Sequence, residues 1–155
     1  MKILGTGSAL PKKVVTNDDL STFLDTSDAW ILPRTGIRSR HVISDEQIED
    51  LGTEAALKAL EMSGLKPSDI DYFLCSNVLT EFVTPGLSCI IADKIGLKCP
   101  CVDVNCACPG FIFALDIAEA KYKAGQVKNV LVVCCEEPTR TVSYTHLTLP
   151  TNREV

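Results

Sequence analysis

The chain has 155 residues, a length that suits one domain of ordinary size, and 46% of them are hydrophobic and 23% charged, which excludes wholesale disorder. Its net charge of −5 argues against a general nucleic-acid-binding protein, because such a protein needs a basic face to replace phosphate counterions. No apolar run approaches the ~20 residues of a membrane span, and the N-terminus lacks the pattern of a secretory signal. Eight cysteines without such a signal indicate a reducing compartment, so we expect a soluble, cytoplasmic domain with free thiols.

The N-terminal third of the chain predicts one strand and two short helices. Residues 2–8 form a short apolar run that ends in Gly and Ser, which is typical of a buried strand before a turn. Asn17 and Ser27 are residue types that cap helices well, and they predict helices over residues 17–23 and 27–33.

The rest of the chain predicts helices and strands in alternation. Ser44 and Gln47 fit a capping box that opens a long helix, and Gly64 ends it. The elements that follow are a strand over 70–78, a helix over 86–95 that Gly96 ends, a strand over 101–105, a helix over 109–124 and a strand over 129–135. Because the first of these strands is apolar on both faces, we expect an α/β fold with a mainly parallel sheet covered by helices.

Residues 142–155 differ from the sequence before them. They show no apolar periodicity, and residues 142–151 can be read back into codons that match the transposase adaptor of a sequencing-library kit. A genuine polar tail is the alternative. We treat residues 142–155 as non-native and expect the domain to comprise residues 1–141.

Cys108 is the first candidate for chemistry. It follows a predicted strand and stands immediately before Pro109, a residue favoured in the first position of a helix. A sulfur at the positive end of a helix is favoured as the thiolate, the form that acts as a nucleophile. The alternative is a buried, inert cysteine.

The cysteine spacing also raises the possibility of a metal site. The pairs Cys99–Cys101 and Cys106–Cys108 could hold zinc with four thiolates, but neither pair has the usual two-residue spacing. We therefore expect no metal. The other four cysteines are interpreted as small core residues: Cys75, Cys89, Cys134 and Cys135.

Three segments together resemble one enzyme family. They are GTGSALP at 5–11, DTSDAWILPRTGIRSRH at 25–41 and DVNCACPGFIFAL at 103–115. Over residues 1–141 the chain resembles β-ketoacyl-ACP synthase III, a condensing enzyme of the thiolase superfamily. The resemblance implies the N-terminal half of a thiolase-like fold and places the acyl-accepting cysteine at Cys108. Cys106 stands where the family usually has a small residue, and Pro109 departs from the small residue that usually follows the cysteine.

Trp30 and Arg34 are four residues apart and share one face of a helix that begins at Ser27. A Trp ring beside a guanidinium can sandwich a flat base, and Arg also binds phosphate. A core anchor and a solvated charge are the alternative. The resemblance implies that this pair binds the adenine of coenzyme A, with Thr26 as a further contact. Arg38 and Arg40 extend the basic character but are equally interpreted as solvated or paired.

The resemblance implies transfer of an acyl group from acyl-CoA to Cys108 and condensation with malonyl-ACP to give 3-oxoacyl-ACP, the first step of fatty-acid synthesis. It also implies a homodimer and no cofactor beyond the coenzyme A thioester used as substrate. The family takes a catalytic His and Asn from its C-terminal half, whereas this chain has only His41 and His146. We therefore expect the 155-residue chain to be inactive by itself. The alternatives are a polyketide starter synthase and a cysteine-rich metal-binding module.

Overall fold

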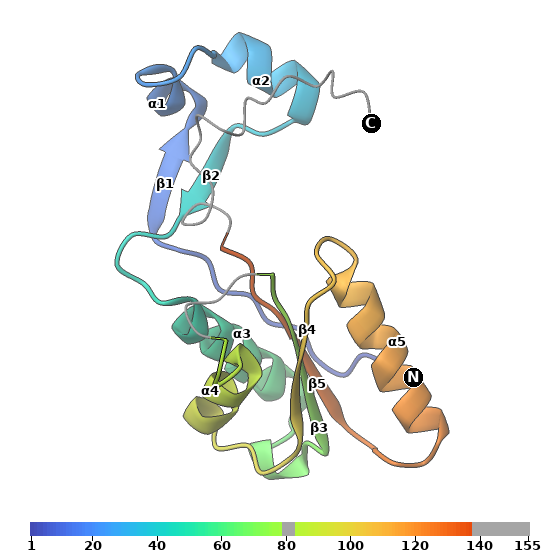
Figure 1. Ribbon diagram of the computed structural model, residues 1–155. Helices are drawn as coiled ribbons and strands as arrows, with labels where there is room; N and C mark the ends of the chain where they lie inside the picture. The colour runs from blue at the N-terminus through green and yellow to red at the C-terminus, as the bar shows by residue number, and fades with distance from the viewer. Residues whose placement is uncertain (79–82, 138–155) are drawn as a thin grey trace. The chain divides into compact units, whose positions relative to one another are not determined.

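The computed structural model describes residues 1–78 and 83–137. The chain divides into two compact units (Figure 1). The first unit combines Met1–Ala9 with Gln47–Glu136, and the second contains Leu10–Glu46. The first unit holds a parallel sheet with helices, and the second holds an antiparallel hairpin with two short helices.

The sheet of the first unit has three parallel strands in the order β4-β3-β5. They are β3 (Tyr72–Ser76), β4 (Cys101–Val104) and β5 (Val130–Cys134). All three lie within the ranges predicted from apolar runs, so the expected parallel α/β arrangement is confirmed. Phe73 of β3 is paired with Cys101 on one side and Leu131 on the other. Residues 73–76 are buried, as expected for a central strand with both faces covered.

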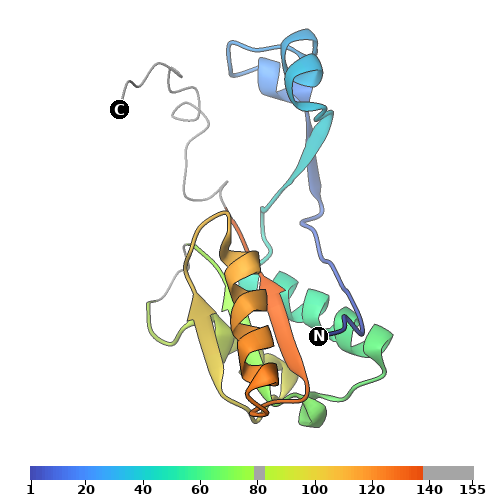
Figure 2. The same cartoon turned by 90° about the vertical axis from the view of Figure 1, so that its right-hand side faces the viewer.

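Helices cover both faces of this sheet. They are α3 (Ile48–Ser63), α4 (Leu87–Ile95) and α5 (Gly110–Lys123), and a short 3-10 helix, η1 (Pro67–Asp69), stands between α3 and β3 in the chain. Helices α3 and α4 pack against each other on one face, and α5 lies across the other face (Figures 1 and 2). Gly64 and Gly96 end α3 and α4 in the left-handed conformation that favours glycine, which confirms both predicted helix ends.

The core of the first unit lies in two layers, one on each side of the sheet. Successive side chains of a strand point to opposite faces. Phe73 and Cys75 of β3 therefore pack with side chains of α3 and α4, whereas Leu74 packs against Ala114 and Ala118 of α5. The two small residues let α5 approach the sheet closely, which sets the position of the turn that precedes it.

The second unit is a hairpin with two short helices, and its hairpin was not predicted. Its elements are β1 (Lys13–Thr16), α1 (Asn17–Ser21), α2 (Asp28–Thr35) and β2 (Ser39–Val42). Strands β1 and β2 pair antiparallel. Ser27 caps α2 as predicted, with its Oγ 3.2 Å from the amide of Trp30. Helix α1 is capped by Thr16 in a capping box with Asp19, so the prediction of Asn17 as its cap is wrong.

Two further local predictions are wrong. Residues 2–8 form no strand within the described part of the chain, because a strand exists only when its backbone groups are paired. Helix α3 begins at Ile48, and Gln47 rather than Ser44 is its N-cap residue, without a side-chain cap. The carboxylate of Glu46 instead accepts hydrogen bonds from the amides of Lys12 at 2.8 Å and Ser44 at 3.1 Å.

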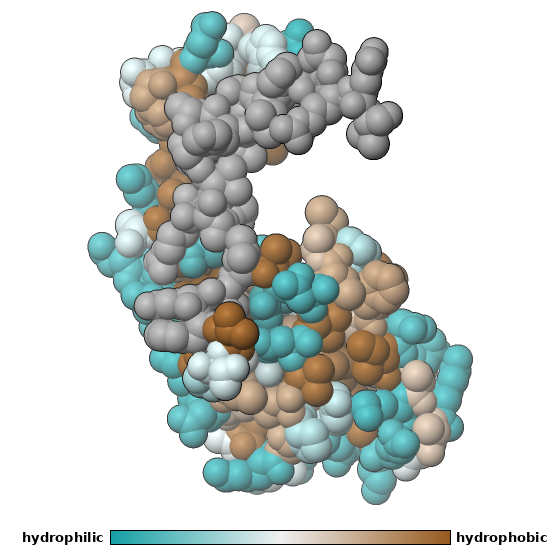
Figure 3. All heavy atoms as spheres, viewed as in Figure 1, coloured by the Kyte–Doolittle hydropathy of each residue, from teal (hydrophilic) through white to brown (hydrophobic). Residues whose placement is uncertain are grey.

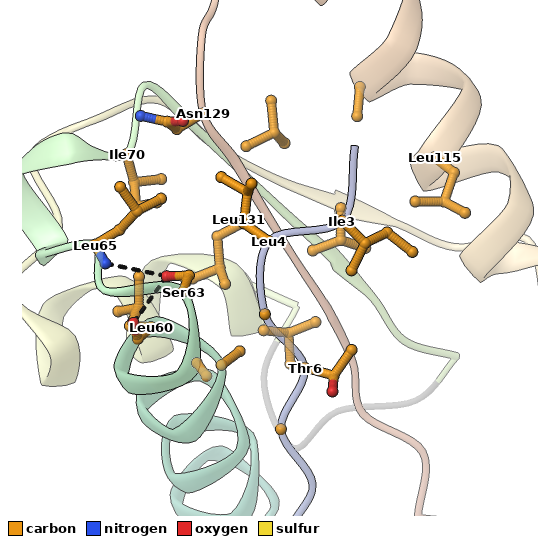
Figure 4. A pocket seen from close by; sticks show the side chains of 18 of the residues that line it. Ile3, Leu4, Thr6, Leu60, Ser63, Leu65, Ile70, Leu115, Asn129 and Leu131 are labelled. Atoms are coloured by element: carbon orange, nitrogen blue, oxygen red, sulfur yellow. Dashed lines mark hydrogen bonds between the residues drawn. The ribbon is translucent and has the colours of Figure 1, made fainter. Parts of the chain in front are cut away.

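A cavity of about 600 Å³ lies beside β5. Its lining includes Ile3 and Leu4 of the N-terminal segment, Leu131 of β5 and Leu115 of α5 (Figure 4). Apolar side chains also remain on the surface of this unit, and Figure 3 shows some of them in brown on the visible face. None of the residues that line the cavity is a predicted site residue, so the candidate chemistry lies elsewhere.

Candidate active site

Cys108 lies in the turn between β4 and α5, and its side chain is exposed. Helix α5 begins at Gly110 with Pro109 as its N-cap residue, so Cys108 is the neighbour of the cap. Ala107 has a φ of 52°, a conformation that non-glycine residues rarely adopt. This turn therefore holds Cys108 at the carboxyl end of β4, where parallel α/β sheets commonly carry their chemistry.

The turn is fastened to the end of β3. The amide of Asn77 donates to the carbonyl of Val104 at 3.3 Å, and Nδ2 of Asn105 donates to the carbonyl of Val78 at 3.1 Å. A Cβ on Gly110 would collide with the side chain of Ser76. The Ser76 hydroxyl would therefore have to move to admit any larger residue where α5 starts.

The start of α5 is not capped by a side chain, and its first turn carries no acidic residue. The first amides of a helix lack partners within the helix and give this end a partial positive charge. Negative charge that develops beside such an end is stabilised. This end of α5 is therefore suited to the charge that forms when a thiol attacks a carbonyl group.

Trp30 and Arg34 lie together on α2 in the second unit. The guanidinium carbon of Arg34 lies 4.7 Å from the centre of the Trp30 ring, and Nη1 donates to the carbonyl of Trp30 at 3.0 Å. The Trp30 side chain is 55% exposed. Because the guanidinium already covers one face of the ring, a planar base would stack on the other face or displace the guanidinium. Thr26 is half-buried, two residues before the helix.

The other basic residues of this segment have different surroundings. Arg40 donates to the carbonyl of Val15 at 3.1 Å and to Oδ1 of Asn17 at 2.6 Å. Arg40 is therefore paired within the unit, which was one of the two interpretations that the sequence left open. Arg38 is exposed. His41 lies on β2, with Nδ1 2.6 Å from the carbonyl oxygen of Pro11, and His146 lies outside the described residues.

The four cysteines that were interpreted as core residues fall into two groups. Cys75 and Cys135 are buried, as predicted, whereas Cys89 and Cys134 are exposed, so their interpretation as core residues is wrong. The pKa of Cys75 is raised, mainly by a hydrogen bond with Cys135 and also by burial. Such a buried thiol is not available as a nucleophile.

Cys99 and Cys101, one of the two cysteine pairs considered as zinc ligands, are half-buried. Desolvation raises the pKa of Cys99 and raises the pKa of Cys101 to about 11. Among residues 1–78 and 83–137, no group of three or more His, Cys, Asp or Glu side chains is arranged to hold a metal ion.

The structure thus brings Trp30 and Arg34 together in the second unit and places Cys108 in the first. The sequence reasoning missed Asn17 as a residue of interest, because its position before a helical pattern made it look like a cap. Its burial, with 1% of its surface exposed, is visible only in the structure. No helix in the described residues is long and apolar enough to cross a membrane.

Comparisons with known proteins found a matching family model, similar solved structures and similar curated sequences. A family model described as 3-oxoacyl-[acyl-carrier-protein (ACP)] synthase III matches residues 102–152, which include Cys108 and α5. The matched residues run past Thr141 into the segment for which an adaptor origin was predicted. The structure is similar to that of 3-oxoacyl-[acyl-carrier-protein] synthase III from Aquifex aeolicus, with a TM-score of 0.89 and 40% identity over 92% of this chain and 46% of that one.

A priming β-ketosynthase of the R1128 polyketide pathway is also similar, with a TM-score of 0.84 and 38% identity over 88% of this chain and 41% of that one. Similar curated sequences include the β-ketoacyl-[acyl-carrier-protein] synthases III of Clostridium acetobutylicum and Xanthomonas euvesicatoria. The first is 47% identical over 88% of this chain and 42% of its own length, and the second is 44% identical over 95% and 46%. The chain thus spans about half the length of these relatives.

The fold is therefore that of the thiolase-like condensing enzymes. Within that class the chain is similar to β-ketoacyl-ACP synthases III over 88–95% of its own length and about half the length of those relatives.

Proposed function

We propose that the protein represented by this chain is a condensing acyltransferase that carries its acyl group on Cys108. The observation that carries the proposal is the exposed thiol of Cys108 at the uncapped start of α5, within the segment that the family model matches. A nucleophilic cysteine needs access to its substrate and stabilisation of negative charge, and this position supplies both.

The proposed reaction has two halves. The sulfur of Cys108 attacks the thioester carbonyl of acyl-CoA, coenzyme A leaves as its thiol, and an acyl-cysteine remains. Malonyl-ACP then loses carbon dioxide, and the resulting carbanion attacks the acyl-cysteine. A carbon–carbon bond forms, the carbon–sulfur bond breaks, and 3-oxoacyl-ACP is released as the Cys108 thiol is restored.

The coenzyme A nucleotide is proposed to bind at α2. The free face of the Trp30 ring offers a stacking surface, and the guanidinium of Arg34 lies over its other face, where it can also meet phosphate. Thr26 is proposed as a neighbouring contact. The 55% exposure of the Trp30 side chain supports a binding role over a core role.

We further propose that the 155-residue chain accepts an acyl group but does not condense it. The family resemblance assigns the catalytic His and Asn to a second half, and in this chain His41 is engaged with Pro11. The whole protein is proposed to be a cytoplasmic homodimer that works with malonyl-ACP in fatty-acid synthesis and needs no cofactor beyond its thioester substrate.

A polyketide-priming synthase is the second candidate function. The observation in its favour is the similarity to the R1128 priming β-ketosynthase, at 38% identity. The two functions share the acyl-cysteine chemistry and differ in the acyl primer and the carrier protein. Comparison of acetyl-CoA with longer and branched acyl-CoA primers in the restored full-length protein would separate them.

Peptide mapping after incubation with radiolabelled acetyl-CoA tests the role of Cys108. We expect the label on the peptide that contains Cys108, loss of the label in Cys108→Ser, and its retention in the matched variant Cys106→Ser. With malonyl-ACP added, the chain should yield no acetoacetyl-ACP above the Cys108→Ser background. Label on Cys106, or a Cys108→Ser protein that is labelled like the wild type, would overturn the assignment.

A further inference from the structure

The second unit is built around a buried polar side chain. Within residues 10–46 the buried side chains are Asn17, Leu20 and Ile31, and Asn17 is the most buried, with 1% of its surface exposed. Burial of an amide is unfavourable unless its donors and acceptor are all paired. The partners of Asn17 therefore indicate why an amide stands where an apolar residue would be expected.

The two hydrogens of the Asn17 amide reach both ends of α2. Nδ2 donates to Oδ1 of Asp28 at 2.7 Å and to the carbonyl of Ile37 at 2.8 Å. Asp28 is the first residue of α2, and Ile37 follows Gly36, which ends the helix. One side chain thus holds the helix at its beginning and just beyond its end.

The oxygen of the same amide is held by Arg40 of β2. Nη2 of Arg40 donates to Oδ1 of Asn17 at 2.6 Å, and its Nη1 donates to the carbonyl of Val15 in β1 at 3.1 Å. The backbone amide of Asn17 donates to the carbonyl of Arg38 at 3.3 Å. Asn17 and Arg40 together connect both strands and both helices of the unit.

Helix α2 needs such support. It has only eight residues and contains Pro33, and isolated helices of this length are unstable in water. The side chains of Trp30 and Arg34 are exposed and lie against each other. Their direction therefore depends on how the helix itself is held.

We propose that Asn17 is a positioning residue for the nucleotide site, which it serves by fixing α2 so that Trp30 and Arg34 face the coenzyme A nucleotide together. Arg40 assists by holding the Asn17 amide rather than by contacting phosphate. The inference rests on the proposed coenzyme A site. An aspartate at position 17 would have no side-chain N–H groups to donate. Its carboxylate would lie beside that of Asp28 and repel it.

The chain has a single tryptophan, so the fluorescence of Trp30 reports binding at this site directly. Coenzyme A is titrated into the 155-residue chain, its Asn17→Asp variant and the control Asp18→Asn, which changes the charge at the exposed neighbouring position. The titrations are made under conditions in which circular dichroism shows each protein to be folded. A smaller folded fraction then does not shift the midpoint of coenzyme A binding. We expect a roughly tenfold weaker midpoint for Asn17→Asp and no change for Asp18→Asn.

A double variant provides the rescue. Asn17→Asp combined with Asp28→Asn exchanges donor and acceptor, restores the bond between positions 17 and 28, and keeps an acceptor for Arg40. The carbonyl of Ile37 still lacks its donor in this variant, so it should recover part of the lost affinity. Arg40→Lys keeps the charge but loses the simultaneous contacts with Val15 and Asn17, and it should also weaken the binding of coenzyme A. This variant serves as the test if Asn17→Asp does not fold.

The failures of the two proposals are distinguishable. A wild-type chain whose Trp30 fluorescence does not respond to coenzyme A would overturn the nucleotide site. A wild-type chain that responds, with Asn17→Asp giving the same midpoint or the double variant giving no recovery, would overturn the positioning role alone.

Discussion

At the scale of single residues, side chains that pair with backbone groups determine local structure in the second unit. The carboxylate of Glu46 accepts from the amides of Lys12 and Ser44, and these hydrogen bonds lower its pKa from 4.5 to about 2, the one with Lys12 most. These hydrogen bonds connect Glu46 to a segment more than thirty residues earlier in the chain. They engage the Ser44 amide before the helix, and the capping box predicted at Ser44 does not form.

The lowered pKa of Glu46 predicts an acid-sensitive second unit. Because the folded-state pKa lies below the unfolded value, the carboxylate stabilises the unit above about pH 4.5, and this contribution is lost as the pH falls toward 2. Urea unfolding followed by Trp30 fluorescence measures this stability. As the pH falls across this range, the free energy of unfolding should decrease in the wild type and decrease less in Glu46→Gln. The control Glu61→Gln, in the first unit, should follow the wild type. Equal acid sensitivity of Glu46→Gln and the wild type would contradict the prediction.

The ring of Trp30 is predicted to contribute to binding of coenzyme A. Trp30→Ala removes the stacking face and should weaken binding by about 1–3 kcal/mol, the range measured for bases stacked on aromatic side chains. Trp30→Phe keeps a smaller ring and should lose less. Isothermal titration calorimetry measures both variants without the indole signal, and unchanged affinity in Trp30→Ala would count against the site.

At the scale of elements, close packing of helices on the sheet decides which small residues are required. Gly52 lies in the middle of α3, where alanine would normally favour the helix by about 1 kcal/mol. A Cβ at this position would lie 2.6 Å from Sγ of Cys135 and 2.7 Å from Cδ1 of Ile91. Cys135 and Ile91 are both buried, so one of them must shift within the core to admit a Cβ, and we expect the cost of this shift to outweigh helix propensity.

Gly52→Ala should therefore lower the free energy of unfolding of the first unit by about 1–3 kcal/mol, as expected for an overpacked core. Combination with Ile91→Val, which removes the Cδ1 atom, should recover part of this loss. Chemical denaturation followed by circular dichroism measures both, with Glu61→Ala on the exposed side of α3 as the control. A more stable Gly52→Ala protein would show that the helices separate freely at this point.

At the scale of the whole molecule, the described sheet has two open edges, β4 and β5, and a cavity of about 600 Å³ beside β5. Exposed apolar side chains, among them Phe111, Ile112 and Phe113 at the start of α5, add to this surface. Open strand edges and exposed apolar groups favour association with other chains. We therefore expect the 155-residue chain to be poorly soluble at high concentration.

Residues 142–155 are predicted to contribute nothing to this fold, because they carry no apolar periodicity. They lie outside the described residues. Deletion of 142–155 should leave the unfolding midpoint of the chain unchanged, whereas deletion of the β5 residues 130–134 should abolish cooperative unfolding. Protection of residues 142–155 from proteolysis would instead identify them as native sequence.

The sequence by itself determined the parallel sheet and its helices. Apolar runs predicted all three parallel strands, and Gly64 and Gly96 predicted two helix ends, because periodicity and left-handed glycines act over a few neighbouring residues. The motif around Cys108 and the pairing of Trp30 with Arg34 were likewise readable, since each depends on spacing within one segment.

Only the tertiary structure decided which groups meet across long separations in sequence. The burial of Asn17, its bonds to both ends of α2 and the pairing of Arg40 depend on a hairpin whose strands are more than twenty residues apart. Residues 2–8 have a strand-like pattern, but without a paired neighbour the pattern alone does not form a strand. Local sequence expresses propensity, whereas burial and hydrogen-bond partners are properties of the folded chain.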